Sequence, residues 1–302
     1  MNTLVCDKYG YGIEQEGWIV GLDGKPMTTI AGRSAYLMVR DEVAQITGAE
    51  PGWLSAELLS CQAEVKTEYV HATAKEALDE IKEHIGTLKL AMQRLHSSLG
   101  FETVAYKDMR GVELVAADPN APSYKRVQEW SSTEHGRELL RKTAICSTQL
   151  CVSDGLQGLS IEDKLRMLSQ NYAYLTANYP WIQEINGYSP RLGIIEDLII
   201  SVKRDNFMQA GLIGPNAHDS TWITRPDGTD LQAWFMAHSG AKTLAEMDSK
   251  DAHGLLLKGK MRPTTMDLVC LEHRWADAQA DLDLVLSQLM RVHGQMMDNV
   301  RI

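Results

Sequence analysis

Apolar residues recur every three or four positions over several long stretches of the chain. Between residues 72 and 98 they fall at Leu78, Ile81, Ile85, Leu88, Met92 and Leu95. A stripe with this spacing is typical of an amphipathic helix that packs on a core. The same spacing predicts further helices over residues 36–47, 161–179, 192–203 and 278–300.

Shorter stretches alternate between apolar and polar residues or form brief apolar runs. They predict strands over residues 11–20, 63–69, 145–153 and 268–276. Strands separated by long helices fit parallel βαβ units, and they also fit an antiparallel sheet with helices on one side. The pattern alone leaves both arrangements open.

Length and composition limit the classes of protein that the chain can belong to. The 302 residues contain no internal repeat and no convincing linker, so we expect one domain over residues 1–302. No apolar run approaches the roughly 18–20 residues that cross a membrane, and no secretory signal is visible. The formal net charge of -10 argues against a nucleic-acid binder, which needs Lys and Arg for phosphates. We expect a cytoplasmic protein with neither a membrane nor a nucleic acid as partner.

The cysteines also indicate a cytoplasmic protein. They number five, are scattered along the chain and form no CxxC pair, so neither a zinc site nor a disulfide framework is indicated. Without an export signal we expect free thiols in a reducing cytoplasm.

Carboxylates inside the predicted strands carry the candidate chemistry. Glu14 and Glu16 lie two residues apart, so a strand places them on one face. Glu57 and Glu64 lie seven residues apart, and Glu64 falls within the next predicted strand. Glu272 interrupts a late apolar run two residues before Arg274. Each feature alone fits a solvated surface or a buried ion pair, but together they favour a shared acidic face that binds a cation.

Oxygen donors without a His or Cys cluster select Mg²⁺ or Mn²⁺. Such metals are commonly shared with the phosphates of a nucleotide, which cationic side chains also contact. The chain has no P-loop, no GxGxxG after a strand and no GxSxG elbow. The cationic side chains that could contact the transferred phosphate are those of Arg191, Arg262, Arg274, Lys258 and Lys260.

Five patches resemble, in the same order, motifs of the glutamate–cysteine ligase and carboxylate–amine ligase families. They read GIEQEGWIV, AELLSCQAEVKTEY, ICSTQLCVS, NGYSPR and CLEHRWADAQADL. The resemblance implies an α+β, glutamine synthetase-like fold in which a mainly antiparallel curved sheet forms a cleft and helices pack on its outer face. It implies a single catalytic domain.

The resemblance also implies roles for individual residues. Arg191, Arg274 and Glu272 become catalytic contacts to phosphate or substrate. Gln149 and Cys151 face the nucleotide and its metals, with Lys258, Lys260 and Arg262 nearby; many relatives have His at one or both positions held here by Gln149 and Cys151. The implied metal ligands are Glu14, Glu16, Glu57, Glu64 and Glu272.

The implied reaction uses ATP as co-substrate and Mg²⁺ or Mn²⁺ as cofactor. A carboxylate, by family expectation that of glutamate, attacks the γ-phosphate, and an amine such as cysteine then attacks the acyl phosphate to give an amide. Three alternatives remain open: a phosphotransferase of the same fold, a non-catalytic or regulatory relative that binds nucleotide or amino acid, and a metal-dependent hydrolase. A homo-oligomer is also left open.

The histidines have less specific interpretations. We read His71, His84 and His96 as surface or helix residues. His273 lies between Glu272 and Arg274, so strand alternation predicts that it points to the opposite face.

Overall fold

The structure is a computed structural model, and it describes residues 10–118, 125–153, 158–160, 163, 261–263 and 270–299. The helices expected over residues 161–179 and 192–203 lie outside the described residues except for Asp163. The helices and strands are β1 (Tyr11–Val20), β2 (Thr29–Ile30), β3 (Arg33–Ser34), α1 (Ala35–Thr47), β4 (Leu54–Ala56), β5 (Gln62–Lys66), α2 (Ala74–Leu95), β6 (Gly100–Glu102), α3 (Lys125–Ser131), α4 (Glu134–Thr143), β7 (Ser147–Val152), β8 (Met261–Pro263), β9 (Leu271–Asp277) and α11 (Leu282–Asn299).

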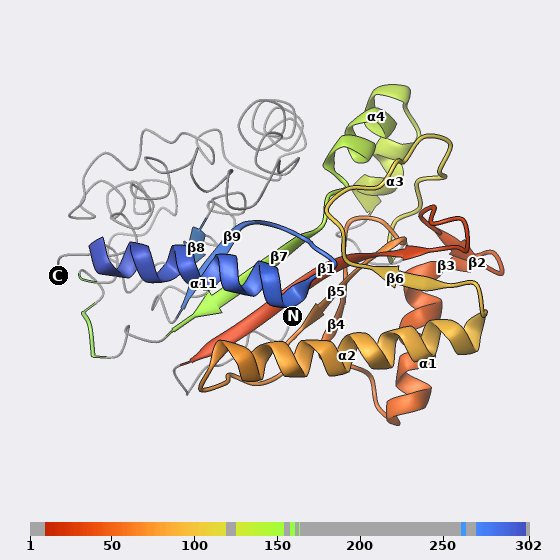
Figure 1. Cartoon of the computed structure of the whole chain (residues 1–302). Coiled ribbons are helices and arrows are strands. Elements are labelled where there is room, and N and C mark those ends of the chain that lie inside the picture. The colour runs from red at the N-terminus through yellow and green to blue at the C-terminus, as the bar shows by residue number, and fades with distance from the viewer. Residues whose placement is uncertain are drawn as a thin grey trace.

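An antiparallel sheet organises this part of the chain (Figure 1). Its strand order is β4-β5-β1-β7-β9-β8, and β6 pairs with β1 beyond the end of β5. Every strand pair among the described residues is antiparallel. The α+β prediction is therefore confirmed, and the parallel βαβ alternative is excluded for this sheet.

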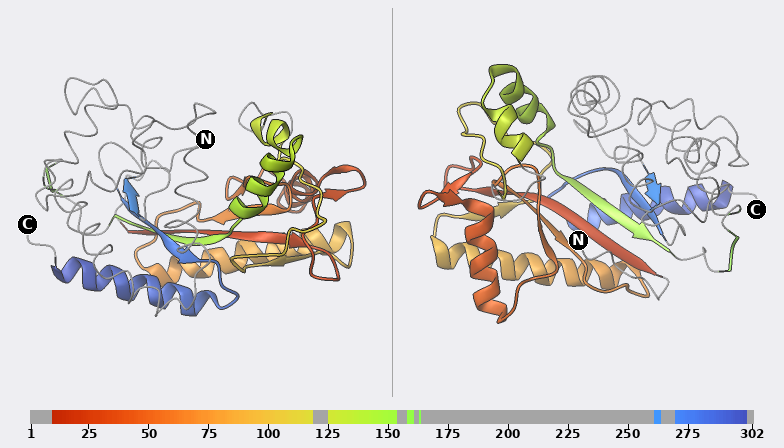
Figure 2. Two further views of the ribbon diagram at one scale, coloured as in Figure 1. Left: turned by 90° about the horizontal axis from the view of Figure 1, so that it is seen from above. Right: turned by 180° about the vertical axis from the view of Figure 1, so that it is seen from behind.

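Helices α1, α2 and α11 cover one face of the sheet (Figures 1 and 2). Ile13 and Ile19 of β1 point to that face and join a core with the apolar sides of the three helices. Helices α3 and α4 pack on the opposite face near one end, where Trp18 of β1 is fully buried with Leu140 of α4. Alternation along β1 thus leaves Gly12, Glu14, Glu16 and Trp18 on the face away from α2.

Helix α2 forms where the apolar stripe predicts it. Thr73 caps its first turn, and Glu76 returns a hydrogen bond to the Thr73 backbone to complete a capping box. All stripe positions from Leu78 to Met92 are buried. Helix α1 begins after the Ser34 cap and ends at Gly48, whose φ of 76° favours glycine. Among the described residues, no helix is both long and apolar enough to cross a membrane.

Strand β9 contains an irregularity that alternation alone does not predict. Leu150 of β7 pairs with His273, and Thr148 pairs with Ala276, so β9 has one extra residue in this interval. A bulge of this kind changes which residues share a face. His273 and Ala276, three residues apart, consequently both lie on the helix side, where Ala276 joins the core.

Candidate functional site

Three carboxylates meet on the face of the sheet away from α2. Glu16 of β1 lies directly opposite Glu64 of β5 in the antiparallel register. Glu57 reaches the same place from the loop between β4 and β5. One carboxylate oxygen from each of the three lies within 4.8 Å of the others. This carboxylate cluster, Glu16, Glu57 and Glu64, joins the first two predicted acidic patches.

The cluster is electrostatically costly while all three members are ionised. Burial, followed by the negative charges of Glu57 and Glu16, raises the pKa of Glu64 to about 8. Ser55 Oγ donates a hydrogen bond of 2.7 Å to Glu64 Oε1, which partly opposes this shift. Like charges at this spacing require protonation or a cation to be stable. Protonation of Glu64 relieves this repulsion in the metal-free protein.

Strand β7 supplies donors that hold Glu16 in position. The Ser147 backbone N–H donates to Glu16 Oε2 at 2.7 Å, and Gln149 Nε2 donates to Oε1 at 2.8 Å. Gln149 Nε2 also lies 3.2 Å from Ser147 Oγ. Two hydrogen bonds of this strength fix the carboxylate of a side chain that is only 4% exposed.

The side-chain amide of Gln149 brings a further oxygen close to Glu16, because its Nε2 donates to Glu16 Oε1. Gln149 Oε1 is buried and accepts no hydrogen bond among the described residues. A buried acceptor of this kind normally has a partner. Carboxylate and amide oxygens are the donors that Mg²⁺ and Mn²⁺ prefer, so the residues present fit the implied metal.

Glu14 and Glu272 act on the Cys151 thiol and are not part of the carboxylate cluster. Cys151 pairs in register with Glu272 on β9 and with Gly12 on β1. A hydrogen bond with Cys270 and burial, together with the charges of Cys270, Glu272 and Glu14, raise the pKa of the Cys151 thiol well above its usual value. Glu14 and Glu272 thus influence the thiol, and neither belongs to the group of three carboxylates. Their roles as metal ligands remain predictions.

His273 points away from Glu272, as alternation predicts. Its Nε2 lies 2.9 Å from Nδ1 of His293 on α11. Burial and the neighbouring His293 lower the pKa of His273 well below its usual value. The neutral form of His273 is thus favoured at this contact between β9 and α11, on the other side of the sheet from the carboxylates.

The structure describes only part of the predicted set of Arg and Lys residues. Arg262 of β8 pairs in register with Glu272 of β9, and Arg274 lies in β9 beside the bulge. The side chains of both arginines lie outside what the structure describes. Three further predicted residues, Arg191, Lys258 and Lys260, lie wholly outside the described residues. Contacts from these five residues to phosphate remain predictions.

Two residues that shape the cluster are missing from the sequence-based site. Ser147 lies two positions before Gln149, so the period of a strand places it on the same face. That signal was present in the sequence. Ser55 lies in a three-residue strand, β4, that shows no clear alternation and was not predicted.

Comparisons with known proteins relate this fold to two solved structures. No protein-family profile matches the chain, and no curated protein matches it. A glutamate–cysteine ligase from Francisella tularensis, crystallised with AMP, superposes with a TM-score of 0.57 and 11% identity. A bifunctional glutathione synthetase from Pasteurella multocida gives 0.55 and 14%.

The lengths covered by these superpositions differ. The first covers 98% of this chain and 68% of the Francisella protein. The second covers 95% of this chain but only 38% of the Pasteurella protein. At such identities the likeness concerns the fold. The chain therefore has an antiparallel α+β fold similar to that of these two proteins.

Proposed function

We propose that this chain is an ATP-dependent carboxylate–amine ligase of glutamine synthetase-like fold, acting as one domain. The observation that carries the proposal is the carboxylate cluster, in which strand register brings together acidic residues from separate patches. The fold likeness to a glutamate–cysteine ligase supports it independently. The proposed substrates are a small carboxylate, glutamate by resemblance, and an amine such as cysteine.

The proposed metal is Mg²⁺ or Mn²⁺, held by Glu16, Glu57 and Glu64 with Gln149 Oε1 as a further donor. When bound, it would neutralise charge on the ATP phosphates as the γ-phosphoryl group is transferred. The hydrogen bonds from Ser147 and Gln149 preorganise Glu16 for this task. Glu64 would lose its proton as the metal enters, because its pKa is about 8 in the metal-free protein.

The protein's own contribution would be position and charge. In the proposed reaction the substrate carboxylate displaces ADP from the γ-phosphorus of ATP. The amine then displaces phosphate from the resulting acyl phosphate and loses a proton to give the amide. Glu272 and Arg274 of β9 are the proposed contacts to the reacting groups, with Arg191, Lys258, Lys260 and Arg262 as further contacts to phosphate. Glu14 would be a ligand of another Mg²⁺ or Mn²⁺ ion next to the carboxylate cluster.

A matrix of amino acids and amines, read by ADP release and product mass, tests this proposal. We expect ADP release only with Mg²⁺ and with both an acid and an amine present. Glu272→Gln should abolish turnover and retain the circular dichroism spectrum of the wild type. Glu83→Gln, at an exposed position on α2, is the matched control and should keep full activity. Unchanged turnover in Glu272→Gln would refute the proposed role of that strand.

A second candidate function is a relative that binds nucleotide without turning it over. The observation that favours it is the hydrogen bond between Cys151 and Cys270. This contact raises the pKa of the Cys151 thiol, and a thiol that keeps its proton is a poor metal ligand. This candidate predicts that calorimetry detects Mg²⁺–ATP binding and that no combination of acid and amine releases ADP.

A further inference from the structure

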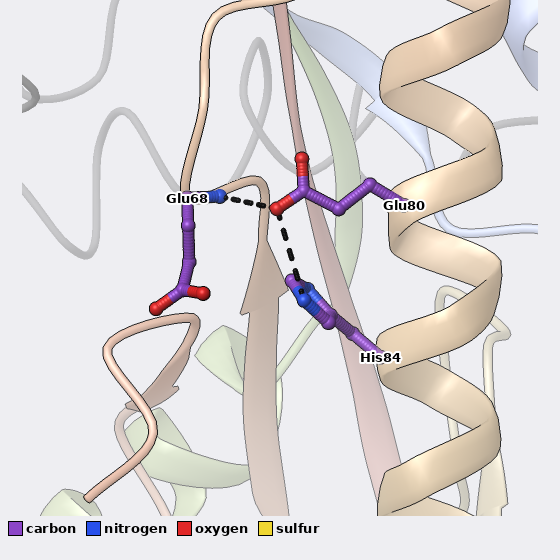
Figure 3. Close-up of side chains that lie close together, drawn as sticks. All are labelled: Glu68, Glu80 and His84. Carbon is purple, nitrogen blue, oxygen red and sulfur yellow. Dashed lines mark hydrogen bonds and ion pairs between the residues drawn. The ribbon is translucent and has the colours of Figure 1, made fainter. Parts of the chain in front are cut away.

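A second group of metal-ligating side chains lies where the chain leaves β5 and enters α2 (Figure 3). Glu80 and His84 are four residues apart on α2, so they lie on one side of the helix. Glu68 comes from the loop that follows β5. One potential ligand atom from each lies within 4.8 Å of the others. None of these residues belongs to the carboxylate cluster.

The ring of His84 is oriented by contacts outside this group. Its Nδ1 lies 3.2 Å from the backbone oxygen of Lys66, the last residue of β5. The ring also stacks on Trp53, with centroids 4.4 Å apart and planes 11° apart. With Nδ1 donating to the carbonyl, Nε2 is the ring nitrogen on the Glu80 side, 3.7 Å from Glu80 Oε1. Metal-binding histidines are held by the same kind of backbone contact.

Both oxygens of Glu80 are held as well. The backbone N–H of Glu68 donates to Glu80 Oε1 at 2.8 Å, and His71 Nε2 pairs with Glu80 Oε2. Gly52 lies against Glu68, because a Cβ atom at that position would stand 3.0 Å from Glu68 Oε1. The fold therefore leaves room for the Glu68 carboxylate beside two residues whose orientation is already fixed.

We propose that Glu68, Glu80 and His84 form a second metal site that binds Zn²⁺. One imidazole nitrogen and two carboxylate oxygens are a donor set that Zn²⁺ accepts, and a water would complete four-fold coordination. Ligand bonds of about 2.0–2.2 Å place neighbouring ligand atoms roughly 3.4 Å apart. The 3.7 Å separation of His84 Nε2 and Glu80 Oε1 is close to that value. Glu68 is exposed and free to adjust.

The imidazole of His84 gives this site a different metal preference from that of the carboxylate cluster. Imidazole favours Zn²⁺ over Mg²⁺, whereas oxygen donors alone favour Mg²⁺. The second site joins α2 to the end of β5, the strand that carries Glu64. A bound ion would thus hold the helix against the strand and stabilise the folded protein by mass action. The proposal does not depend on the ligase activity.

Zn²⁺ titration of the full-length, chelator-treated protein by calorimetry tests the proposal. We expect a site that Glu68→Gln and His84→Gln each weaken at least about tenfold, as loss of a ligand or its support does. Glu64→Gln should leave that site intact. His96→Gln, at an exposed position just after α2, is the matched control and should bind as the wild type does.

Thermal unfolding provides a second measurement. Zn²⁺ should raise the Tm of the wild type and of Glu64→Gln, and at the same Zn²⁺ concentration it should raise the Tm of Glu68→Gln clearly less. Glu68 is exposed, so this variant retains the stacking of His84 on Trp53 and separates ligation from packing. Binding that survives both Glu68→Gln and His84→Gln, or that Glu64→Gln alone abolishes, would overturn the proposal.

Discussion

Replacing Glu64 by Gln should change how the stability of the protein depends on pH. Its pKa is about 8 in the folded protein, against an ordinary value of 4.5. The folded state therefore holds a proton that the unfolded state has released between these two pH values. Stability is present below pH 4.5 and is lost as pH rises through this window. Gln cannot titrate, so Glu64→Gln removes this loss.

The size of the effect follows from the shift. Each pKa unit corresponds to about 1.4 kcal/mol, so a shift from 4.5 to about 8 gives an upper bound of about 5 kcal/mol, reached above pH 8. Denaturant unfolding should show that, as pH rises through this range, the free energy of unfolding of Glu64→Gln increases relative to that of the wild type by up to that amount. Saturating Mg²⁺ should narrow the gap, because the ion stabilises the ionised cluster. Parallel pH profiles for the two proteins, with and without Mg²⁺, would refute the electrostatic argument.

Three further substitutions test the packing and the cluster. Gln149→Leu removes the 2.8 Å hydrogen bond to Glu16 and the buried oxygen, so Mg²⁺ affinity by calorimetry should fall at least about tenfold; unchanged affinity would exclude Gln149 from the site. Leu88→Ala, at a fully buried position on α2, should lower the free energy of unfolding by about 2–5 kcal/mol, and a loss below about 1 kcal/mol would contradict that packing. Gly17→Ala places a Cβ atom 2.3 Å from Phe101 Cζ and should lower the free energy of unfolding by about 1–3 kcal/mol. Adding Phe101→Leu should restore part of that free energy. A neutral Gly17→Ala would show that Phe101 moves freely.

Local patterns in the sequence predict the long elements well. Strand β1 matches the prediction over residues 11–20, and α2 covers most of residues 72–98. In both, a regular period reports the side on which the core lies. The predicted strands over residues 63–69, 145–153 and 268–276 appear with shifted ends. Strands β2, β3, β4, β6 and β8 have two or three residues each, too few for a period to be visible.

Cross-strand register explains where the site prediction falls short. Alternation places Glu14 and Glu16 on one face, but it does not say which neighbours each one meets. Register brings Glu16 opposite Glu64, whereas Glu14 lies opposite Gln149 and near the Cys151 thiol. Long-range pairing sets such contacts, so a local pattern cannot predict them.

Long-range contacts also explain why the sequence does not predict the bulge in β9 or the proposed zinc site. Alternation predicts that Glu272 and Arg274 share a face, but the extra residue in β9 is set by pairing with β7. The spacing of Glu80 and His84 was visible in the sequence, although it suggested only a helix surface. Contacts with the end of β5 and the loop that follows it bring Glu68 next to Glu80 and His84, and local spacing does not predict these contacts.

Hydroxylamine trapping tests the central claim most directly. With Mg²⁺, ATP, the substrate acid and hydroxylamine in place of the amine, the wild type should form the hydroxamate and ADP in equal amounts. Chelation of the metal should abolish both products, and the Glu83→Gln control should form both. ADP released without hydroxamate would indicate phosphotransfer or hydrolysis. Absence of both products over the whole range of acids would contradict the assignment as a ligase.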